Sequence, residues 1–455
     1  MTNGTDPSRR EPRQAASQTA RDALLWLGIY LLAVTAPLFA LLPGAVLPGR
    51  GFVWDFAMAL GYAGMAMLGV QFVLTARFKR ATAPFGIDIV YYFHRYLALA
   101  ALAIVLAHYA LLRVHSPLAL GPVDPREATA HMTAGRIALG LFVLLVVSSL
   151  ARRVLGFEYD LWRRVHAALS TVAFALAIWH LLGAANYLEG GWKQGLWAMY
   201  GAFWLGVIGY VRLVRPGRLA RRPWRVVDIR PERGQVHTLT LEPDDHEGLQ
   251  FAPGQFAWLT LRASPYAMRE HPFSIASSAE RNDKIELSIK SLGDFTSTVG
   301  TVRKGEVAWV DAPYGTFGVD LRPEAEGYVF IVGGIGIAPA LSMLRTLADR
   351  ADQRPLWMFY GNRAWDRVAF REELGRLAQV LPLRLVHILQ EPPADWEGER
   401  GLITEELFAR HLPATRARLE YFVCGPTPMT HVAEVALAHL GVPAERVHSE
   451  IFDWV

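Results

Sequence analysis

The first 215 residues carry long apolar runs, whereas the rest of the chain alternates apolar and polar positions over short stretches. A helix needs about 20 apolar residues to cross a bilayer, and each long run is near that length. The pattern predicts six membrane-spanning helices, at residues 22–42, 52–74, 89–113, 133–151, 163–183 and 193–214. The first run alone has an alternative interpretation as a signal peptide, but it is long and five further spans follow it.

The second half of the chain reads as two smaller domains. The segments WRVVDIR, QVHTLTLE, QFAWLTL, KIELSIK and EVAWVDA have the length and alternation of strands, at a spacing typical of a small antiparallel β-barrel. Past residue 323, strand-like and helix-like segments alternate as in a doubly wound α/β sheet. The predicted organisation is a polar tail (1–21), a six-helix transmembrane α bundle (22–215), an antiparallel β-barrel (216–322) and a doubly wound α/β domain (323–455).

Basic residues indicate how the spans are oriented. Lys and Arg gather in the loops after the second and fourth spans and after the last one, at positions 77, 79, 80, 152, 153, 163, 164, 212, 215 and 218. The positive-inside rule then places both termini and the second half of the chain in the cytoplasm, with the spans in membrane lipid. The formal charge of +4 reflects this topology. No basic face is interleaved with aromatic residues, so no nucleic-acid partner is expected, and the sequence specifies no oligomeric state.

Four histidines lie inside predicted spans, where ionisable side chains are costly and usually functional. His94 and His108 lie 14 residues apart in one apolar segment, and His166 and His180 lie 14 residues apart in another. Fourteen residues fall about 40° short of four full helical turns, so each pair shares one helix face. The rise between the two members is about 21 Å. Two such helices side by side would present two facing histidine pairs, one near each leaflet.

The predicted orientation pairs His94 with His166 near the inner face and His108 with His180 near the outer face, because both spans run from inside to outside. Two stacked haems with two imidazole ligands each need this arrangement. The alternative is that each histidine bonds a hydroxyl or carbonyl group of a neighbouring helix. Two histidines of one helix cannot share a metal ion, because they are about 21 Å apart.

Short motifs mark the second half of the chain: HPFSIAS from His271, LGDFTSTV from Leu292, GGIGIAP from Gly333 and CGPTPM from Cys424. Main-chain amides after residue 293 could receive an anionic pyrophosphate at a helix start. GGIGIAP follows the apolar strand YVFIV, and a strand, a Gly-rich turn and a helix form the phosphate-binding arrangement of nucleotide folds. The sole cysteine, Cys424, excludes an internal disulfide and a four-cysteine iron–sulfur cluster. It has an alternative interpretation as a packed core residue.

Taken together, these motifs resemble the ferric reductase and NADPH oxidase superfamily, and the chain is similar to a bacterial member of it. The resemblance covers roughly residues 22–455 and includes the two histidine pairs, HPFS, GDFT, GGIGIAP, CGPTPM and an aromatic C-terminus. It implies a six-helix ferric-reductase-type haem domain fused to a ferredoxin–NADP reductase-like module. The implied enzyme is an NAD(P)H oxidase or ferric reductase that uses FAD, two b-type haems and NADPH or NADH.

The resemblance also implies a role for each matched residue. The flavin motif would be His271, Pro272, Phe273 and Ser274, with the serine near the isoalloxazine edge. The FAD pyrophosphate would lie along Lys290, Gly293, Asp294, Phe295 and Thr296. The nicotinamide-dinucleotide phosphate loop would be Gly333, Gly334, Gly336 and Pro339. The nicotinamide would be lined, where hydride leaves, by Cys424, Gly425 and Pro426. The haem irons would be ligated by His94, His108, His166 and His180.

Two assignments stay open. The family's terminal aromatic covers the flavin, and it aligns best with Phe452; Trp454 is the alternative, because three residues follow Phe452 whereas the family often ends on the aromatic. Arg363 and Arg367 follow a predicted strand end, where they could pair with a 2′-phosphate and so favour NADPH over NADH. They are equally consistent with solvated surface charges.

The predicted function is transmembrane electron transfer from cytoplasmic NAD(P)H through FAD and two haems to a small acceptor on the far side, O2 or ferric chelate. One alternative is an electron-transfer subunit that delivers electrons to a periplasmic or membrane partner protein. Another is a non-enzymatic scaffold with a degenerate reductase module, against which the intact motifs argue.

Overall fold

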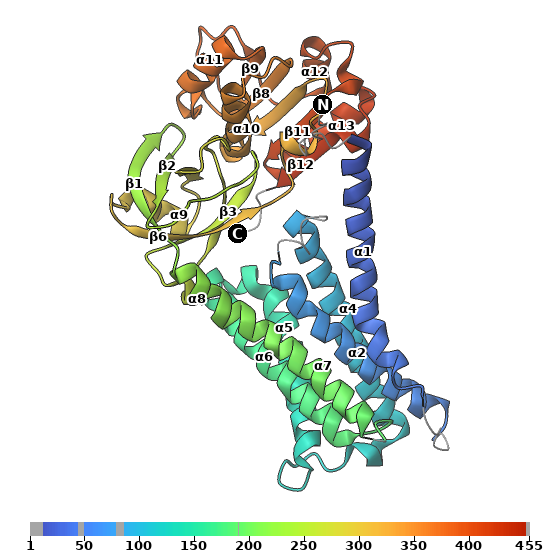
Figure 1. The fold of residues 1–455 in the computed structure, drawn as a ribbon. Helices are drawn as coiled ribbons and strands as arrows, with labels where there is room; N and C mark the ends of the chain where they lie inside the picture. Colours follow the sequence, from blue (N-terminus) through green and yellow to red (C-terminus); the bar gives the residue numbers. More distant parts are fainter. Residues whose placement is uncertain (1–11, 44–49, 79–85, 190, 452–455) are drawn as a thin grey trace, which may run out of the picture. The chain divides into compact units, whose positions relative to one another are not determined.

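The computed structural model describes residues 12–43, 50–78, 86–189 and 191–451 of the chain and divides into two compact units (Figure 1). One unit comprises residues 17–217, and the other contains everything from Arg218 onward. Each unit is described separately below.

The first unit is a bundle of long helices. They are α1 (Pro12–Phe39), α2 (Phe52–Thr75), α4 (Gly86–His115), α5 (Ala130–Leu155), α6 (Tyr159–Ala184) and α7 (Trp192–Gly209), with a short η1 turn (Pro117–Leu120) after α4. A π-helical turn, Tyr210–Val214, joins α7 to α8 (Arg215–Ala220). Within the described residues, five helices are long and apolar enough to cross a membrane, and the first predicted span is a shorter apolar helix, Leu24–Phe39. The predicted multi-pass helical bundle is confirmed.

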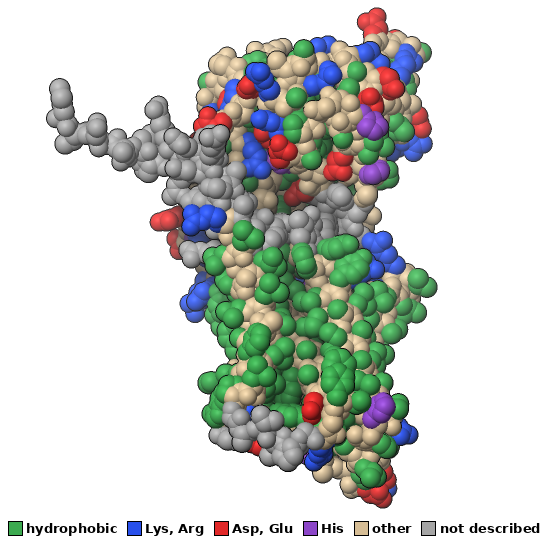
Figure 2. Space-filling view, turned by 90° about the vertical axis from the view of Figure 1, so that its right-hand side faces the viewer, with side chains coloured by type: hydrophobic (Ala, Val, Ile, Leu, Met, Phe, Trp, Pro, Cys, Tyr) green, Lys and Arg blue, Asp and Glu red, His purple; other side chains and the backbone are tan. Residues whose placement is uncertain are grey.

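The bundle buries several large aromatic side chains and exposes many large aliphatic ones. Helix α2 packs along α4 and α5 along α6. Phe174 and Trp197 are fully buried in the centre. Leu32 and Leu144, in contrast, are among many large apolar side chains on the outside. Figure 2 shows hydrophobic side chains covering the middle of this face of the bundle. An exposed apolar surface of this kind is solvated by lipid tails rather than by water.

The second unit begins with a curled antiparallel sheet. Its strands are β1 (Pro223–Glu232), β2 (Val236–Pro243), β3 (Phe256–Leu261), β4 (His271–Ser274), β5 (Ile285–Lys290) and β6 (Val307–Tyr314), in the order β4-β3-β6-β1-β2-β5. A bridge between Ile275 and Leu287 joins the ends of this order, so the sheet curls toward a closed barrel. The short helix α9 (Asp294–Thr298) follows β5. The alternating strands predicted from the sequence form this small barrel.

A parallel sheet follows. Its strands are β7 (Tyr328–Gly333), β8 (Leu356–Asn362), β9 (Leu383–Leu389), β10 (Glu399–Arg400), β11 (Glu420–Gly425) and β12 (Val447–Ile451), in the order β10-β9-β8-β7-β11-β12. The helices are α10 (Ile337–Asp349), α11 (Arg371–Val380), α12 (Glu405–His411) and α13 (Thr427–His439). Side chains of α10 and α11 pack on one face of the sheet, and side chains of α12 and α13 on the other. The predicted doubly wound α/β domain is confirmed.

The order of the parallel strands defines a crevice. The chain leaves β7 toward β8 on one side and later returns to β11 on the other side of β7. In open α/β sheets, ligands bind at the carboxyl ends of the strands where the order reverses in this way. The structure therefore places the ends of β7 and β11 at the binding edge.

Candidate functional site

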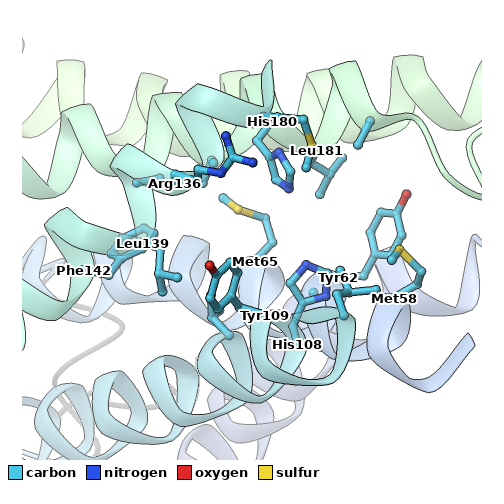
Figure 3. Close-up of a pocket in the computed structure, with 18 of the residues that line it drawn as sticks. Met58, Tyr62, Met65, His108, Tyr109, Arg136, Leu139, Phe142, His180 and Leu181 are labelled. Atoms are coloured by element: carbon cyan, nitrogen blue, oxygen red, sulfur yellow. The ribbon is translucent and has the colours of Figure 1, made fainter. Parts of the chain in front are cut away.

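The outer histidine pair lines a cavity in the helical unit. His108 on α4 and His180 on α6 contribute to its wall, together with side chains of α2 and α5. The cavity holds about 1000 Å³ of space, including its open mouth. Figure 3 shows the two imidazoles pointing toward each other across it. The residues predicted to pair near the outer face thus do face each other.

Main-chain carbonyl groups fix the outer imidazoles. His108 Nδ1 lies 2.7 Å from the carbonyl oxygen of Ala57 on α2, and His180 Nδ1 lies 3.1 Å from the carbonyl oxygen of His131 on α5. A carbonyl oxygen only accepts hydrogen bonds, so each Nδ1 carries the hydrogen. The lone pair of each Nε2 is then free, which is the state in which a histidine ligates a metal. The two sequence interpretations, a neighbouring-helix bond and ligation, are therefore compatible.

Two glycines make room for these imidazoles. Gly61 lies four residues after Ala57, and Gly135 lies four residues after His131. A Cβ on Gly61 would lie 3.0 Å from ring atoms of His108, and a Cβ on Gly135 would lie 2.6 Å from ring atoms of His180. Because a helical Cβ tilts back over the preceding turn, any side chain there would cover the carbonyl that the imidazole reaches. In the sequence, this feature is a glycine four residues after the residue whose carbonyl group accepts the hydrogen bond. It can be recognised only after the structure has shown which carbonyl group that is.

The inner pair is held by side chains. The Gln71 amide on α2 lies 2.6 Å from His94 Nδ1, and the Ser149 hydroxyl on α5 lies 3.4 Å from His166 Nδ1. The ring of Trp162 lies 5.0 Å from the His166 ring. Sequence reasoning missed Gln71 and Ser149. A single buried amide in the otherwise apolar second half of α2 was the available signal.

The donor set of the cavity suits a large flat cofactor better than a bare metal ion. In the part of the chain that the structure describes, no group of three or more His, Cys, Asp and Glu side chains could hold one ion. Two imidazoles from opposite helices with apolar side chains between them, such as Met65, Leu139 and Phe142, fit a haem with two axial histidines.

Arg136 adds a positive charge at this cavity. Its Nη2 donates to the carbonyl oxygens of Leu120, at 2.5 Å, and Gly121, at 3.3 Å. Its Nη1 is buried and has no hydrogen-bond partner among the described residues. The guanidinium lies on the same side of the cavity as His180 (Figure 3). A buried guanidinium donor of this kind suits a carboxylate, such as a haem propionate.

In the second unit, the HPFS motif forms β4 beside β3. His271 is buried, and its ring stacks on Phe295 with centroids 4.0 Å apart. Phe273 stacks on the same Phe295 ring, with centroids 6.0 Å apart. Pro272 lies between His271 and Phe273 in β4. Ser274 is buried, and its Oγ has no hydrogen-bond partner among the described residues. A buried hydroxyl without a protein partner is costly unless a ligand supplies one, so this position fits the flavin edge.

The GDFT turn is ordered by its threonine. Thr296 Oγ1 accepts hydrogen bonds at 2.9 Å from the N–H groups of Leu292 and Gly293. Thr296 therefore shapes the turn before α9, in which Asp294 is exposed. The role of this turn along the FAD pyrophosphate stays a prediction.

The GGIGIAP loop and the CGPTPM turn meet at the crevice. Cys424 on β11 pairs in register with Val332 on β7. A Cβ on Gly336 would collide with the Cys424 carbonyl oxygen, and a Cβ on Gly333 would lie 2.6 Å from Met429 Sδ. Only glycine therefore allows the two strand ends to approach this closely.

The resemblance assigns this loop and the CGPTPM turn to the nicotinamide dinucleotide, and Lys290 to the FAD pyrophosphate. Gly334 has a positive φ of 55°, and a Cβ there would lie 3.7 Å from Lys290 Nζ at the end of β5. Pro339 lies in the first turn of α10, and Gly425 and Pro426 lead from β11 into α13. The structure thus brings the lysine of the barrel to the phosphate loop of the α/β domain.

Cys424 stays a neutral thiol. It is fully buried, and burial raises its pKa well above the ordinary value. Glu450 lies opposite it on β12 and raises the pKa further. A thiol in this state is a packing group rather than a nucleophile.

Arg363 follows β8, but it is not a free cation. Its Nε donates to Glu391 Oε1 at 2.9 Å, and the main chain also pairs Glu391 N with Arg363 O at 2.7 Å. The structure therefore places an acidic group where only a basic one was predicted. The terminal aromatic, Phe452 or Trp454, lies outside the described residues.

Three family models match consecutive stretches of the chain. The ferric reductase like transmembrane component matches residues 60–177, the FAD-binding domain 225–315 and the oxidoreductase NAD-binding domain 330–434. The chain has the ferric reductase and NADPH oxidase architecture. The resemblance, the assignment as an oxidoreductase and the FAD and NAD(P)H domains are thereby confirmed for this multi-pass membrane protein.

Individual relatives match about half of the chain. The reductase component of propane 2-monooxygenase from Mycolicibacterium smegmatis is 30% identical over 241 residues, which cover 50% of this chain and 66% of that protein. A flavohemoprotein from Deinococcus radiodurans is 30% identical over 244 residues, covering 51% and 59%. The match thus spans less than two thirds of either relative. The solved FAD/NAD-binding domain of nitric oxide dioxygenase from Vibrio cholerae is 22% identical, with a TM-score of 0.45, and covers 51% of this chain and 98% of that domain.

Proposed function

We propose that this chain moves electrons from NAD(P)H on the cytoplasmic side of a bacterial inner membrane to O2 or a ferric chelate on the far side, with FAD and two b-type haems bound on the way. The observation that carries the proposal is the pair of imidazoles, His108 and His180, that face each other across an apolar cavity with Nδ1 engaged and Nε2 free. The inner pair, His94 and His166, is contacted at Nδ1 by the side chains of Gln71 and Ser149 instead of by main-chain carbonyl groups.

The cofactors supply chemistry that no side chain here provides. FAD takes two electrons as a hydride from nicotinamide and releases them singly, and haem carries one electron at a time. The chain's own residues bind and orient. The glycines at the ends of β7 and β11 admit the dinucleotide to the crevice, and Lys290, beside this loop, offers a cation to the FAD pyrophosphate. Ser274 Oγ offers a hydrogen bond to the flavin edge.

In the membrane, the four imidazoles would bind the haem irons, and Arg136 would offer its Nη1 donor and its positive charge to a carboxylate of the outer haem. The lipid-facing bundle and its buried aromatic core exclude water from the ligand sites. The cytoplasmic placement of the second unit is supported by the Arg-rich loops on one side, such as Arg152 and Arg153.

An anaerobic reduced-minus-oxidised spectrum of the purified protein with FAD and NADPH tests the proposal. We expect haem bands that reduce with NADPH, and in air they should reoxidise with superoxide formed. Reduced haem that persists in air but reoxidises with ferric chelate would assign the ferric reductase activity. Absence of haem bands would refute the proposal.

His108→Leu sharpens this test. It should lower the haem content from two per chain to one, whereas His115→Leu, on the same helix but exposed, should leave it unchanged.

The second candidate is an electron-transfer subunit that serves a partner protein. It is favoured by the Mycolicibacterium relative, whose name describes a reductase component of a monooxygenase. This candidate predicts haem that reduces with NADPH but turns over slowly with both O2 and ferric chelate.

A further inference from the structure

We propose that Gln71 and Ser149 are positioning residues that set the hydrogen bonding, and through it the redox potential, of the inner histidine pair. The inference rests on the proposed function, because it concerns imidazoles that ligate haem. The outer pair is supported by main-chain carbonyl groups, which are not deleted by changing the side chain of the residue that carries them. The inner and outer histidine pairs therefore differ in whether their hydrogen-bond partner at Nδ1 is a side chain, which a single substitution can replace, or a main-chain carbonyl group.

Gln71 is placed to bond His94 from the neighbouring helix. It is 7% exposed and lies on α2, which packs along α4. With its nitrogen toward His94, the amide donates to Nδ1 at 2.6 Å and to the His94 carbonyl oxygen at 3.2 Å, and its oxygen accepts from the Ala98 N–H at 3.2 Å. Burying a primary amide inside an apolar span costs free energy unless the amide makes hydrogen bonds, and His94 and Ala98 supply such bonds to Gln71.

The amide can serve either tautomer of His94. With the nitrogen toward the ring, Nδ1 is bare and the hydrogen sits on Nε2, which then cannot bind iron. When Nε2 binds iron, Nδ1 carries the hydrogen, and the amide must turn its oxygen toward the ring to accept it, which gives up its hydrogen bonds with the His94 carbonyl oxygen and the Ala98 N–H. Gln71 is thus a reversible partner, whereas Ala57 O and His131 O hold the outer imidazoles in the ligating tautomer at all times.

Ser149 gives His166 a weaker acceptor. Its hydroxyl donates to the Leu145 carbonyl oxygen at 2.6 Å, so its oxygen lone pairs face His166 Nδ1 at 3.4 Å. That distance is at the limit of a hydrogen bond. Of the two inner histidines, His94 therefore contacts an amide that can rotate, and His166 contacts a hydroxyl that accepts only a weak hydrogen bond.

A hydrogen bond from Nδ1–H makes the imidazole a stronger electron donor to the iron, which stabilises the oxidised state. Removing the acceptor at His94 should therefore raise the midpoint potential of the inner haem and leave the outer one unchanged. We expect about a tenfold change in the reduced-to-oxidised ratio at a fixed potential for Gln71→Leu, or about 59 mV for one electron. Ser149→Ala should move the same potential in the same direction by less.

The experiment uses the full chain purified in detergent. Haem content per chain, both midpoint potentials from an optical redox titration and the low-spin haem g-values from electron paramagnetic resonance are measured for Gln71→Leu, Gln71→Glu and Ser149→Ala. Gln71→Glu keeps an oxygen acceptor and should hold the potential at or below that of the wild type. Ser148→Ala and Thr75→Val are matched controls, because each removes a hydroxyl that bonds a carbonyl oxygen of its own helix.

The outcomes separate the two claims. The inference is supported if only one midpoint potential shifts, the g-values change for that haem alone, and the control variants are unchanged. It is also supported if Gln71→Leu loses one haem and Gln71→Glu restores it. Two haems with both potentials unchanged, or both potentials shifted together, would overturn the inference and leave the proposed function intact. Loss of haem in Gln71→Leu and Gln71→Glu alike would show a packing role and also overturn it. A wild-type protein without haem would refute the proposed function itself.

Discussion

The His180 imidazole reaches the carbonyl oxygen of His131 through the gap that Gly135 leaves on α5. The contact is 3.1 Å long, and Gly135 lies one helical turn after the carbonyl that it uncovers. His108 repeats this relationship on α2, with Ala57 as the acceptor and Gly61 one turn later. The two copies come from different helix pairs, α5 with α6 and α2 with α4. The same local solution therefore orients both imidazoles of the outer site.

Gly135→Val should abolish haem binding at the outer site. A Cβ at this position would lie 2.6 Å from the His180 ring, and an overpacked contact costs about 1–3 kcal/mol or displaces the ring from its acceptor. Haem content per chain should fall toward one. Gly140→Val is the matched control, because nothing lies within 4 Å of a Cβ at that position of α5. Two haems in Gly135→Val would contradict the role assigned to this glycine.

Ser274→Ala should weaken FAD binding without destabilising the apoprotein. Its Oγ makes no hydrogen bond to the described residues, so alanine removes an unpaired buried hydroxyl. One lost ligand hydrogen bond should raise the FAD dissociation constant roughly two- to tenfold, measured by flavin fluorescence. Ser277→Ala provides the contrast: its Oγ accepts from the Glu286 N–H at 3.1 Å, so this change should lower the free energy of unfolding. Equal FAD affinity in Ser274→Ala and wild type would remove this serine from the flavin site.

Glu391→Gln should increase the use of NADPH relative to NADH. Glu391 forms an ion pair with Arg363 after β8. Its carboxylate would repel the 2′-phosphate of NADPH and would neutralise the Arg363 charge that attracts this phosphate. Both side chains are largely exposed, so the change in the ratio of kcat/KM for the two coenzymes should be about two- to fivefold. Arg363→Ala should lower kcat/KM for NADPH more than for NADH. If the ratio is the same in all three proteins, coenzyme choice is made elsewhere.

Acid should destabilise the α/β domain through His387. Burial, followed by the charge of Arg371, lowers the pKa of His387 from its ordinary value of about 6.5 to about 4. Between these values the unfolded chain binds a proton that the folded chain does not. Stability is therefore present above pH 6.5 and falls by up to about 1.4 kcal/mol per pH unit as the pH drops toward 4. Unfolding measured at a series of pH values by tryptophan fluorescence, to which Trp365 contributes with its ring 5.1 Å from His387, should show this dependence.

His387→Phe is the variant that isolates this effect. It should flatten the stability profile between pH 6.5 and 4, because phenylalanine cannot bind the proton. An unchanged slope in the variant would mean that another group titrates in this window.

Much of the fold follows from the order of polar and apolar residues. Long apolar runs can only be satisfied in lipid or in a core, and strand-length alternation with Gly-rich turns indicates sheets. The sequence predicted six spans; within the described residues the structure has five as long apolar helices and the first as a shorter one, Leu24–Phe39. It also placed the GGIGIAP loop between β7 and α10. Resemblance to a known family was needed to give these motifs chemical roles.

Contacts between distant segments could not be predicted. Gln71 and His94 lie on different helices, and nothing in the spacing of α2 shows which of its residues face α4. The sequence does not indicate that Glu391 contacts Arg363, because the parallel pairing of β8 with β9 brings the two residues together.

The sequence by itself determined the two histidine pairs, the membrane-spanning runs and the nucleotide motifs, because these depend on local periodicity and on residue chemistry. The tertiary structure alone decided which atom of each histidine is free. That choice depends on the acceptor that a second helix presents: the carbonyl groups of Ala57 and His131 uncovered by glycine, or the side chains of Gln71 and Ser149. Hydrogen bonds act over about 3 Å, so only packing determines which partners come within reach.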